Sequence, residues 1–178
     1  MSIKMLLLVI TILTSPLTYA RQANIGCTEG DCQNGYGVFI SQGGRKYVGD
    51  WKNGLPNGKG LLLVKRSSGT ARYIGSFKDD KRDGTGTILN PDGSIYIGEF
   101  RDDKMYGHGT MYYQDGTRYE GEFKADKLNG EGVLVSPGKL RYEGSFKNNL
   151  PDGRGVLLNY INGSRKAGLF KEGKFLGK

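Results

Sequence analysis

A row of basic residues is the feature of this sequence whose spacing best suits a binding site. A Lys or Arg directly follows an aromatic residue in six copies of a short phrase, and these cations are Lys52, Lys78, Arg101, Lys124, Lys147 and Lys171. If the copies form equivalent strands of one sheet, the cations stand about 10 Å apart, which is two strand separations. Such a row could contact phospholipid headgroups, an acidic polysaccharide or an acidic protein surface.

The same cations also have a purely structural interpretation. Asp50, Glu99 and Glu122 each lie two positions before one of them, and residues two apart on a strand share a face. Each cation could then pair with a carboxylate and merely keep the sheet soluble. The formal net charge of +8 favours anionic partners only mildly, so both interpretations stay open.

No catalytic centre is recognisable in the sequence. The one histidine, His108, is the middle residue of a Gly-x-Gly phrase, and the other copies hold Tyr36, Lys59, Thr85, Glu131 and Arg154 there. A position that accepts such different side chains is typical of a surface, and no nucleophile or orienting carboxylate is tied to His108. The phrase also lacks the Lys-Ser/Thr of a phosphate-binding loop. We therefore predict a protein that is not an enzyme and uses no cofactor or metal.

The basic row belongs to a repeated pattern of aromatic residues and glycine. The phrase Tyr-x-Gly-x-Phe/Trp begins at positions 47, 73, 96, 119 and 142, so successive copies are 26, 23, 23 and 23 residues apart. Its three fixed residues share one face of a strand, because side chains alternate. The aromatic positions are Tyr47, Trp51, Tyr73, Phe77, Tyr96, Phe100, Tyr119, Phe123, Tyr142 and Phe146. We expect most of these rings to pack against adjacent hairpins with the hydroxyls reaching solvent, although the row could instead line a groove for a partner.

Two turn signals in each repeat predict a β-hairpin. Pairs such as Asp92-Gly93 and Asp115-Gly116 favour two-residue turns. Gly, Asp or Asn stands at positions 54, 80, 103, 126 and 149, where we expect a positive φ. The 26-residue copy has its extra residues at Ser67-Ser68-Gly69, where we expect a longer loop. The predicted fold is all-β: an elongated, single-layer antiparallel sheet of stacked β-hairpins.

Residues 1–20 have the organisation of a secretory signal peptide. Lys4 precedes a short apolar run at residues 5–13, and Thr18-Tyr19-Ala20 offers a cleavage site. The run is short for a membrane anchor, which needs about 20 apolar residues. We therefore expect an exported protein, periplasmic or secreted, with an association to the cell envelope as one variant.

Residues 21–34 are predicted to form an N-terminal cap. Cys27 and Cys32 are close in sequence, and in an oxidising compartment we expect a disulfide between them. Free thiols and a lipid-modified Cys27 are the alternatives.

The repeat pattern resembles the MORN (membrane occupation and recognition nexus) repeat. The resemblance covers residues 35–178, with repeats starting near 47, 73, 96, 119 and 142 and a degenerate copy near 166, where Lys166 replaces the tyrosine. The segment from Cys27 to Gly37 also resembles the start of exported bacterial members. The family implies an elongated, often curved or twisted sheet that serves protein scaffolding, dimerisation or, in some members, anionic phospholipid binding.

These observations predict an exported, non-catalytic interaction module that presents a long sheet face to a protein partner. The alternative is a peripheral binder of anionic phospholipid or acidic envelope polysaccharide through the basic row. Nucleic acid is not an expected partner, because an exported protein seldom meets it. Homo-oligomerisation stays open.

Overall fold

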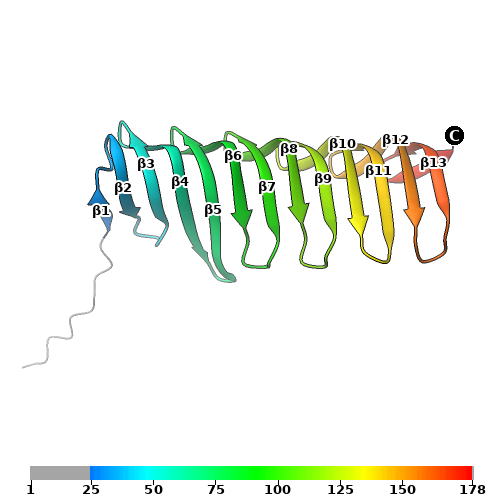
Figure 1. Cartoon of the computed structure of the whole chain (residues 1–178), viewed down its shortest axis with the longest axis horizontal. Helices are drawn as coiled ribbons and strands as arrows, with labels where there is room; N and C mark the ends of the chain where they lie inside the picture. Colours follow the sequence, from blue (N-terminus) through cyan, green and yellow to red (C-terminus); the bar gives the residue numbers. More distant parts are fainter. Residues whose placement is uncertain (1–24, 178) are drawn as a thin grey trace, which may run out of the picture.

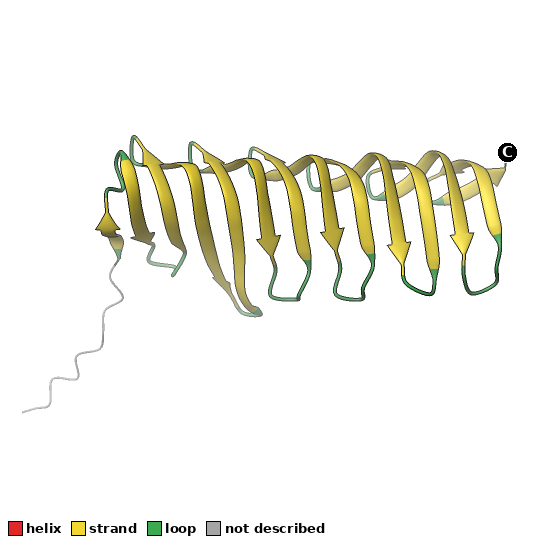
Figure 2. Ribbon diagram, in the orientation of Figure 1, coloured by secondary structure: helices red, strands yellow, loops and turns green. Residues whose placement is uncertain are grey.

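The computed structural model describes residues 25–177, and the expected signal peptide at residues 1–20 lies outside them. All regular structure in this part of the chain is β-strand, and the strands form one antiparallel sheet in chain order. The sheet is long and narrow, with β1 at one end and the C-terminal strands at the other (Figure 1; Figure 2). The predicted fold of successive hairpins is confirmed.

Fourteen strands make up the sheet. They are β1 (Gly26–Gly30), β2 (Gly35–Ile40), β3 (Lys46–Lys52), β4 (Leu55–Arg66), β5 (Gly69–Lys78), β6 (Lys81–Leu89), β7 (Ile95–Arg101), β8 (Lys104–Tyr112), β9 (Arg118–Lys124), β10 (Lys127–Ser136), β11 (Leu140–Lys147), β12 (Leu150–Asn159), β13 (Arg165–Lys171) and β14 (Lys174–Gly177). Among the described residues, no helix is long and apolar enough to cross a membrane.

A bulge bends each of the hairpins formed by β3 to β12 at the same place. In β3–β4, Gly49 pairs with Gly60 and Trp51 pairs with Pro56, so Asp50 alone faces three residues of β4. The same shift recurs in β5–β6, β7–β8, β9–β10 and β11–β12. Between hairpins, as in β4–β5, the pairing is uninterrupted. Because bulges bend and twist strands, the whole sheet bends along one line that follows the glycines.

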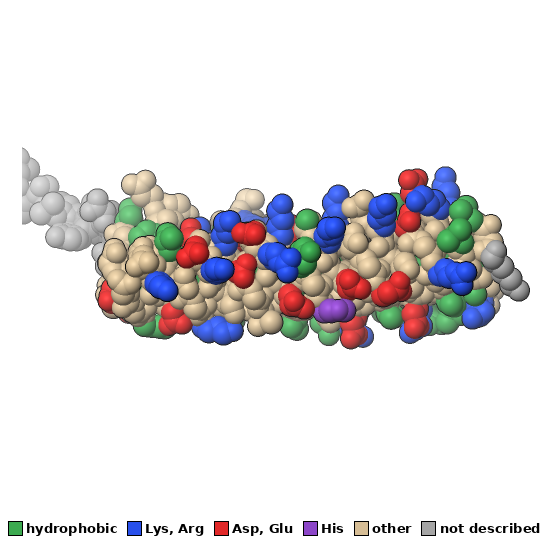
Figure 3. All heavy atoms as spheres, turned by 90° about the horizontal axis from the view of Figure 1, so that it is seen from above, with side chains coloured by type: hydrophobic (Ala, Val, Ile, Leu, Met, Phe, Trp, Pro, Cys, Tyr) green, Lys and Arg blue, Asp and Glu red, His purple; other side chains and the backbone are tan. Residues whose placement is uncertain are grey.

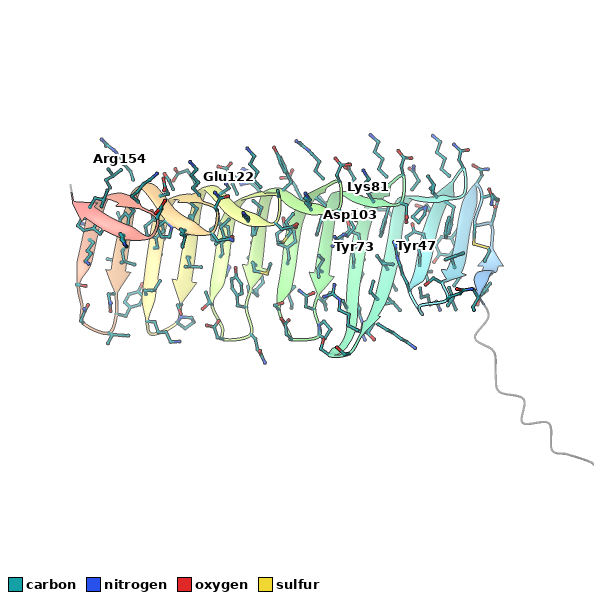
Figure 4. All side chains as sticks on the ribbon, turned by 180° about the vertical axis from the view of Figure 1, so that it is seen from behind. Tyr47, Tyr73, Lys81, Asp103, Glu122 and Arg154 are labelled. Atoms are coloured by element: carbon teal, nitrogen blue, oxygen red, sulfur yellow. A yellow bond between two sulfur atoms is a disulfide. The ribbon has the colours of Figure 1, made fainter. Side chains whose placement is uncertain are left out.

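The bend divides every hairpin into a long arm, which carries the tyrosine, and a short arm, which ends in a tight turn. The short arms fold back over the face that carries the tyrosines (Figure 4); we call this the inner face and the opposite one the outer face. Within residues 25–177, one ion pair joins the two arms directly: Arg45 Nη2 at the far end of a long arm lies 3.3 Å from Asp80 Oδ1 at a short-arm tip.

The aromatic residues form a continuous core between the arms. Each tyrosine ring meets the Phe or Trp of its own repeat and the Phe of the next one edge-on, as in Tyr47–Phe77 and Tyr96–Phe123 at 5.0 and 4.9 Å. The ten predicted rings are 0–8% exposed. Edge-to-face contacts at this distance are favourable, so the row is packing rather than an open groove.

The tyrosine hydroxyls do not reach solvent, and that expectation was wrong. Tyr47 Oη donates a hydrogen bond to the carbonyl oxygen of Asp50 at 2.9 Å, and the other four tyrosines bond the same relative carbonyl. The ring reaches this carbonyl because it lies flat across two facing glycines. A Cβ on Gly60 would lie 2.5 Å from the Tyr47 ring. Glycine is therefore required there by close approach of ring and backbone.

The short-arm turns confirm the expected positive φ and add a link between repeats. Asp103, Asp126 and Asn149 have φ of 68°, 67° and 74°. Their Oδ1 atoms accept hydrogen bonds from backbone N–H groups of the preceding repeat, at Arg82, Met105 and Leu128. Asp80 faces Pro56, which has no N–H to donate, and it pairs with Arg45 instead.

Two expectations about the long-arm turns are corrected. Asp92-Gly93 does not form a two-residue turn: Asn90 and Ser94 close a three-residue loop in which Gly93, at φ 86°, donates to the Asn90 carbonyl. The loop is favoured because the Asp92 carboxylate accepts the Ser94 N–H. The extra residues near Ser67 do not make a longer loop either, because β4 and β5 stay paired as far as Arg66 and Gly69.

The two ends of the sheet extend the same pattern. Cys27 and Cys32 are joined by a disulfide, and Cys32 belongs to the buried core. At the other end, Phe170 continues the aromatic row, 5.0 Å from Tyr142, and Phe175 follows it. The degenerate last copy therefore keeps its place in the core although Lys166 replaces the ring.

Gly109→Ala tests the contact between ring and backbone. A Cβ at Gly109 would lie 2.6 Å from the Tyr96 ring, so we expect the free energy of unfolding in urea to fall by about 1–3 kcal/mol, as in other overpacked cores. Gly43→Ala is the control, because only Ser41 Oγ lies within 4.0 Å of its Cβ. Equal losses in the two variants would contradict this account.

Asp126→Gly tests the link between repeats. Glycine suits the positive φ at Asp126 and at Asp80 equally well, but only Asp126 accepts a backbone N–H from the preceding repeat. We expect Asp126→Gly to be less stable than Asp80→Gly by about 1 kcal/mol in urea denaturation. If the control loses as much stability, the side-chain acceptor is not what joins the repeats.

Candidate functional site

The six cations of the basic row all lie on the outer face at the strand ends beside the short-arm turns. All six are exposed. In the described part of the chain, Lys52, Lys78, Lys124 and Lys147 make no ion pair, whereas Lys171 Nζ lies 3.1 Å from Asp152. The Arg101 guanidinium lies 4.0 Å from the centre of the Tyr106 ring. Seen from above, basic and acidic side chains are interspersed over this side of the molecule (Figure 3).

The carboxylates that could have neutralised this row have another role. Asp50 Oδ2 accepts the backbone N–H of Lys59 at 2.8 Å, and Glu99 and Glu122 accept the equivalent N–H groups of His108 and Glu131. These N–H groups belong to the bulge and have lost their strand partners. The carboxylates therefore accept hydrogen bonds from the backbone N–H groups of the bulge, and they do not form ion pairs with the neighbouring cations.

A hollow beside the first two row members brings three lysines together. Lys52, Lys59 and Lys78 line this outer-face hollow of about 600 Å³, and Asp50 and Asp79 are the acidic groups in its wall. Both carboxylates are already engaged, because Asp50 accepts the Lys59 N–H and Asp79 accepts Asn57 Nδ2 at 3.1 Å. The arrangement can hold a carboxylate or another anion.

An apolar groove adjoins this hollow and runs across the strands from β2 to β8. Its volume is about 880 Å³, and Lys59 lines both spaces. One wall is a row of cross-strand neighbours: Val48, Leu61, Ile74, Thr87 and Ile97. Gly49, Gly60 and the equivalent glycines of the next strands form the floor. Ile74 and Ile97 are 55% and 50% exposed.

A second basic row on the outer face was missed by the sequence analysis. Lys46, Arg72, Arg118 and Arg141 directly precede their tyrosines, and this spacing was the signal that could have revealed them. Arg118 and Arg141 form ion pairs with Glu120 and Glu143 two residues on. Lys46 and Arg72 have Val48 and Ile74 at that place, and they make no ion pair with any described residue.

The largest pKa shifts among the described residues belong to tyrosines of the buried core. Burial raises the pKa of Tyr73 to about 12, although the nearby Arg82 guanidinium acts in the opposite direction. Burial likewise raises the pKa of Tyr47, Tyr96 and Tyr119. The Arg82 guanidinium lies 5.3 Å from the centre of the Phe100 ring, and its Nε lies 3.1 Å from Asp103 Oδ1. Arg82 therefore covers one side of the aromatic core.

His108 lies on the outer face, in agreement with the surface position predicted from the sequence. It is exposed and faces Glu122 of the next strand. In residues 25–177, no group of three or more His, Cys, Asp and Glu residues is placed to hold a metal ion.

Comparison with protein families gives one match, and it follows the repeats described above. The model of the MORN repeat matches residues 47–63, 73–95, 96–118, 119–141 and 142–164, which together are more than half of the chain. Each matched segment begins at the tyrosine that lies across the glycine pair. No curated protein matches the chain closely enough to add to this. The chain therefore belongs to the MORN repeat family, and its sheet is built from five matched repeats with a further hairpin at each end.

Proposed function

We propose that this chain is an exported, non-catalytic binding module that holds a protein partner against the outer face of its sheet. One observation carries the proposal: the aromatic rings of the inner face are buried in the core, whereas the outer face presents exposed aliphatic side chains and cations that make no ion pair within the described residues. Surfaces that combine exposed apolar residues with charge are typical of interaction sites.

Three further features support the parts of this proposal. Each repeat contacts only its neighbours, which gives the extended surface that repeat proteins use for binding. The apolar run after Lys4 supports export, and a disulfide suits an oxidising compartment. His108, the residue type best suited to acid–base catalysis, lies exposed with no orienting partner among the described residues, which supports a non-catalytic role.

A second candidate function rests on the basic row alone. Five of its six cations make no ion pair within the described residues, so the row could bind anionic phospholipid or an acidic envelope polysaccharide. Such binding would be mainly electrostatic and would weaken as salt shortens the Debye length below about 8 Å.

A capture experiment with a lipid arm separates the two candidates. The chain purified after export is immobilised and incubated with envelope extract, and in parallel it is sedimented with phosphatidylglycerol and with phosphatidylcholine vesicles. We expect saturable capture of a discrete set of proteins and equally weak sedimentation with both vesicle types. The control carries Gln at the four row positions outside the lysine hollow, Arg101, Lys124, Lys147 and Lys171, and we expect it to capture the same proteins.

The contrary results are equally clear. Salt-sensitive sedimentation with phosphatidylglycerol that is lost or strongly reduced in the four-Gln variant would replace the protein-binding proposal by the lipid one. Failure to capture any protein would refute the proposal, and so would turnover of a glycan or ester substrate that is abolished by one point substitution.

A further inference from the structure

We propose that the first half of the outer face, from β2 to β8, docks an extended peptide segment of the partner that alternates acidic and aliphatic side chains. This inference deepens the proposed function and rests on it. It places the contact on the glycine-floored groove, and it names the chemistry that the groove and the adjoining lysine hollow would recognise.

The repeats of one chain act as controls for one another, and they differ at this surface. The residue after the tyrosine is Val48, Ile74 and Ile97 in the first three repeats but Glu120 and Glu143 in the next two. In the second half these glutamates neutralise the arginines two residues earlier. The first half has aliphatic side chains at the same sheet position. The difference is therefore not required by the fold, which both halves share.

The charges around the groove select an acidic occupant. Lys46 and Arg72 lie on one side of the aliphatic wall, and Lys59, Lys52 and Lys78 lie on the other; none of the five makes an ion pair within the described residues. The acidic groups on this surface are committed to N–H groups of the protein itself. An occupant with carboxylates along the edge that meets Lys52, Lys59 and Lys78 would pair with cations that have no carboxylate partner within the described residues.

The shape of the groove selects an extended backbone. Its floor is the backbone of successive strands at the glycine positions, whose side-chain direction is toward the tyrosines of the inner face. No side chain of these positions therefore stands between the floor and an extended main chain. The six strands from β3 to β8 span about 24 Å at about 4.8 Å per strand, which matches about seven residues of extended chain at about 3.3 Å each. In an extended peptide alternate side chains point the same way, so one set can meet the aliphatic wall while the other reaches the lysines.

Other occupants fit less well. In a symmetric dimer formed through this patch, Lys46 and Arg72 would face the cations of the same patch on the second copy. These like charges would repel one another. A bilayer surface would use the basic row along its full length, whereas the apolar wall with unpaired cations is confined to the first half. Both occupants remain as outcomes of the test below.

Fluorescent peptides of about eight residues test the inference by anisotropy with the chain purified after export. The probe alternates Glu and Val, and the control peptides alternate Lys with Val and Glu with Ser. We expect saturable binding of the Glu-Val peptide only. In the variant Ile74→Glu with Ile97→Glu, which copies the residue type of the second half, we expect affinity to fall at least about tenfold, the equivalent of about 1.4 kcal/mol.

A matched variant in the other half is the control. Val133→Glu with Val156→Glu makes the same change in the same cross-strand row, and we expect the affinity to change less than about twofold, within about 0.5 kcal/mol. Lys59→Gln with Lys78→Gln should weaken binding and reduce its salt dependence. Circular dichroism and urea denaturation establish that each variant is folded.

Several outcomes would overturn the inference. They are no binding of the Glu-Val peptide, equal binding of the Lys-Val peptide, and equal losses in the two glutamate variants. Phosphatidylglycerol sedimentation that depends on Ile74 and Ile97 would assign the patch to lipid, and a dimer in light scattering that the Ile74→Glu, Ile97→Glu variant abolishes would assign it to a second copy. If this variant captures the same proteins from extract as the unmodified chain, the inference fails while the proposed function stands; if the unmodified chain captures none, the proposed function itself fails.

Discussion

The structure depends on the contact between a tyrosine ring and a pair of facing glycines. The ring of Tyr96 occupies the space that a Cβ on Gly109 would fill, and its hydroxyl satisfies a carbonyl just beyond the bend. The bulge that follows turns the short arm over the ring, and the next repeat contributes Phe123 to the other side. One local fit thus sets the bend, the closure of the inner face and the contact between neighbouring repeats.

Closure of the inner face decides where function can lie. A flat sheet of this composition would expose its aromatic residues on one side, and a partner could bind to them. In the bent sheet those rings are buried, and the outer face carries the variation between repeats. The acidic residues Asp50, Glu99 and Glu122 are used by the bulge, so the cations beside them remain available. The same device that builds the fold therefore leaves a charged outer surface.

A few positions differ from their equivalents in the other repeats, and the contacts around them show whether the protein itself compensates for the difference. Arg82 stands where other repeats have Met105, Leu128 or a proline, and Asp80 is released for an arm-to-arm ion pair because Pro56 has no N–H. These changes are compensated by ion pairs within the protein. Ile74 and Ile97 occupy the position that holds Glu120 in a later repeat, and no other described residue compensates for this difference. We therefore attribute it to binding of a partner and not to the stability of the sheet.

The sequence by itself determined the strands, the hairpins, their order and the family, because period-two patterning and turn residues act over short distances. It also located the left-handed turn positions at residues such as Asp126. Only the tertiary structure decided the bend, since a bulge is visible in pairing and not in composition. For the same reason the acceptors of the tyrosine hydroxyls, the partners of Asp50 and Asp126, and the groove beside Ile74 could not be predicted. Each of them depends on atoms that the bend or a neighbouring repeat brings together.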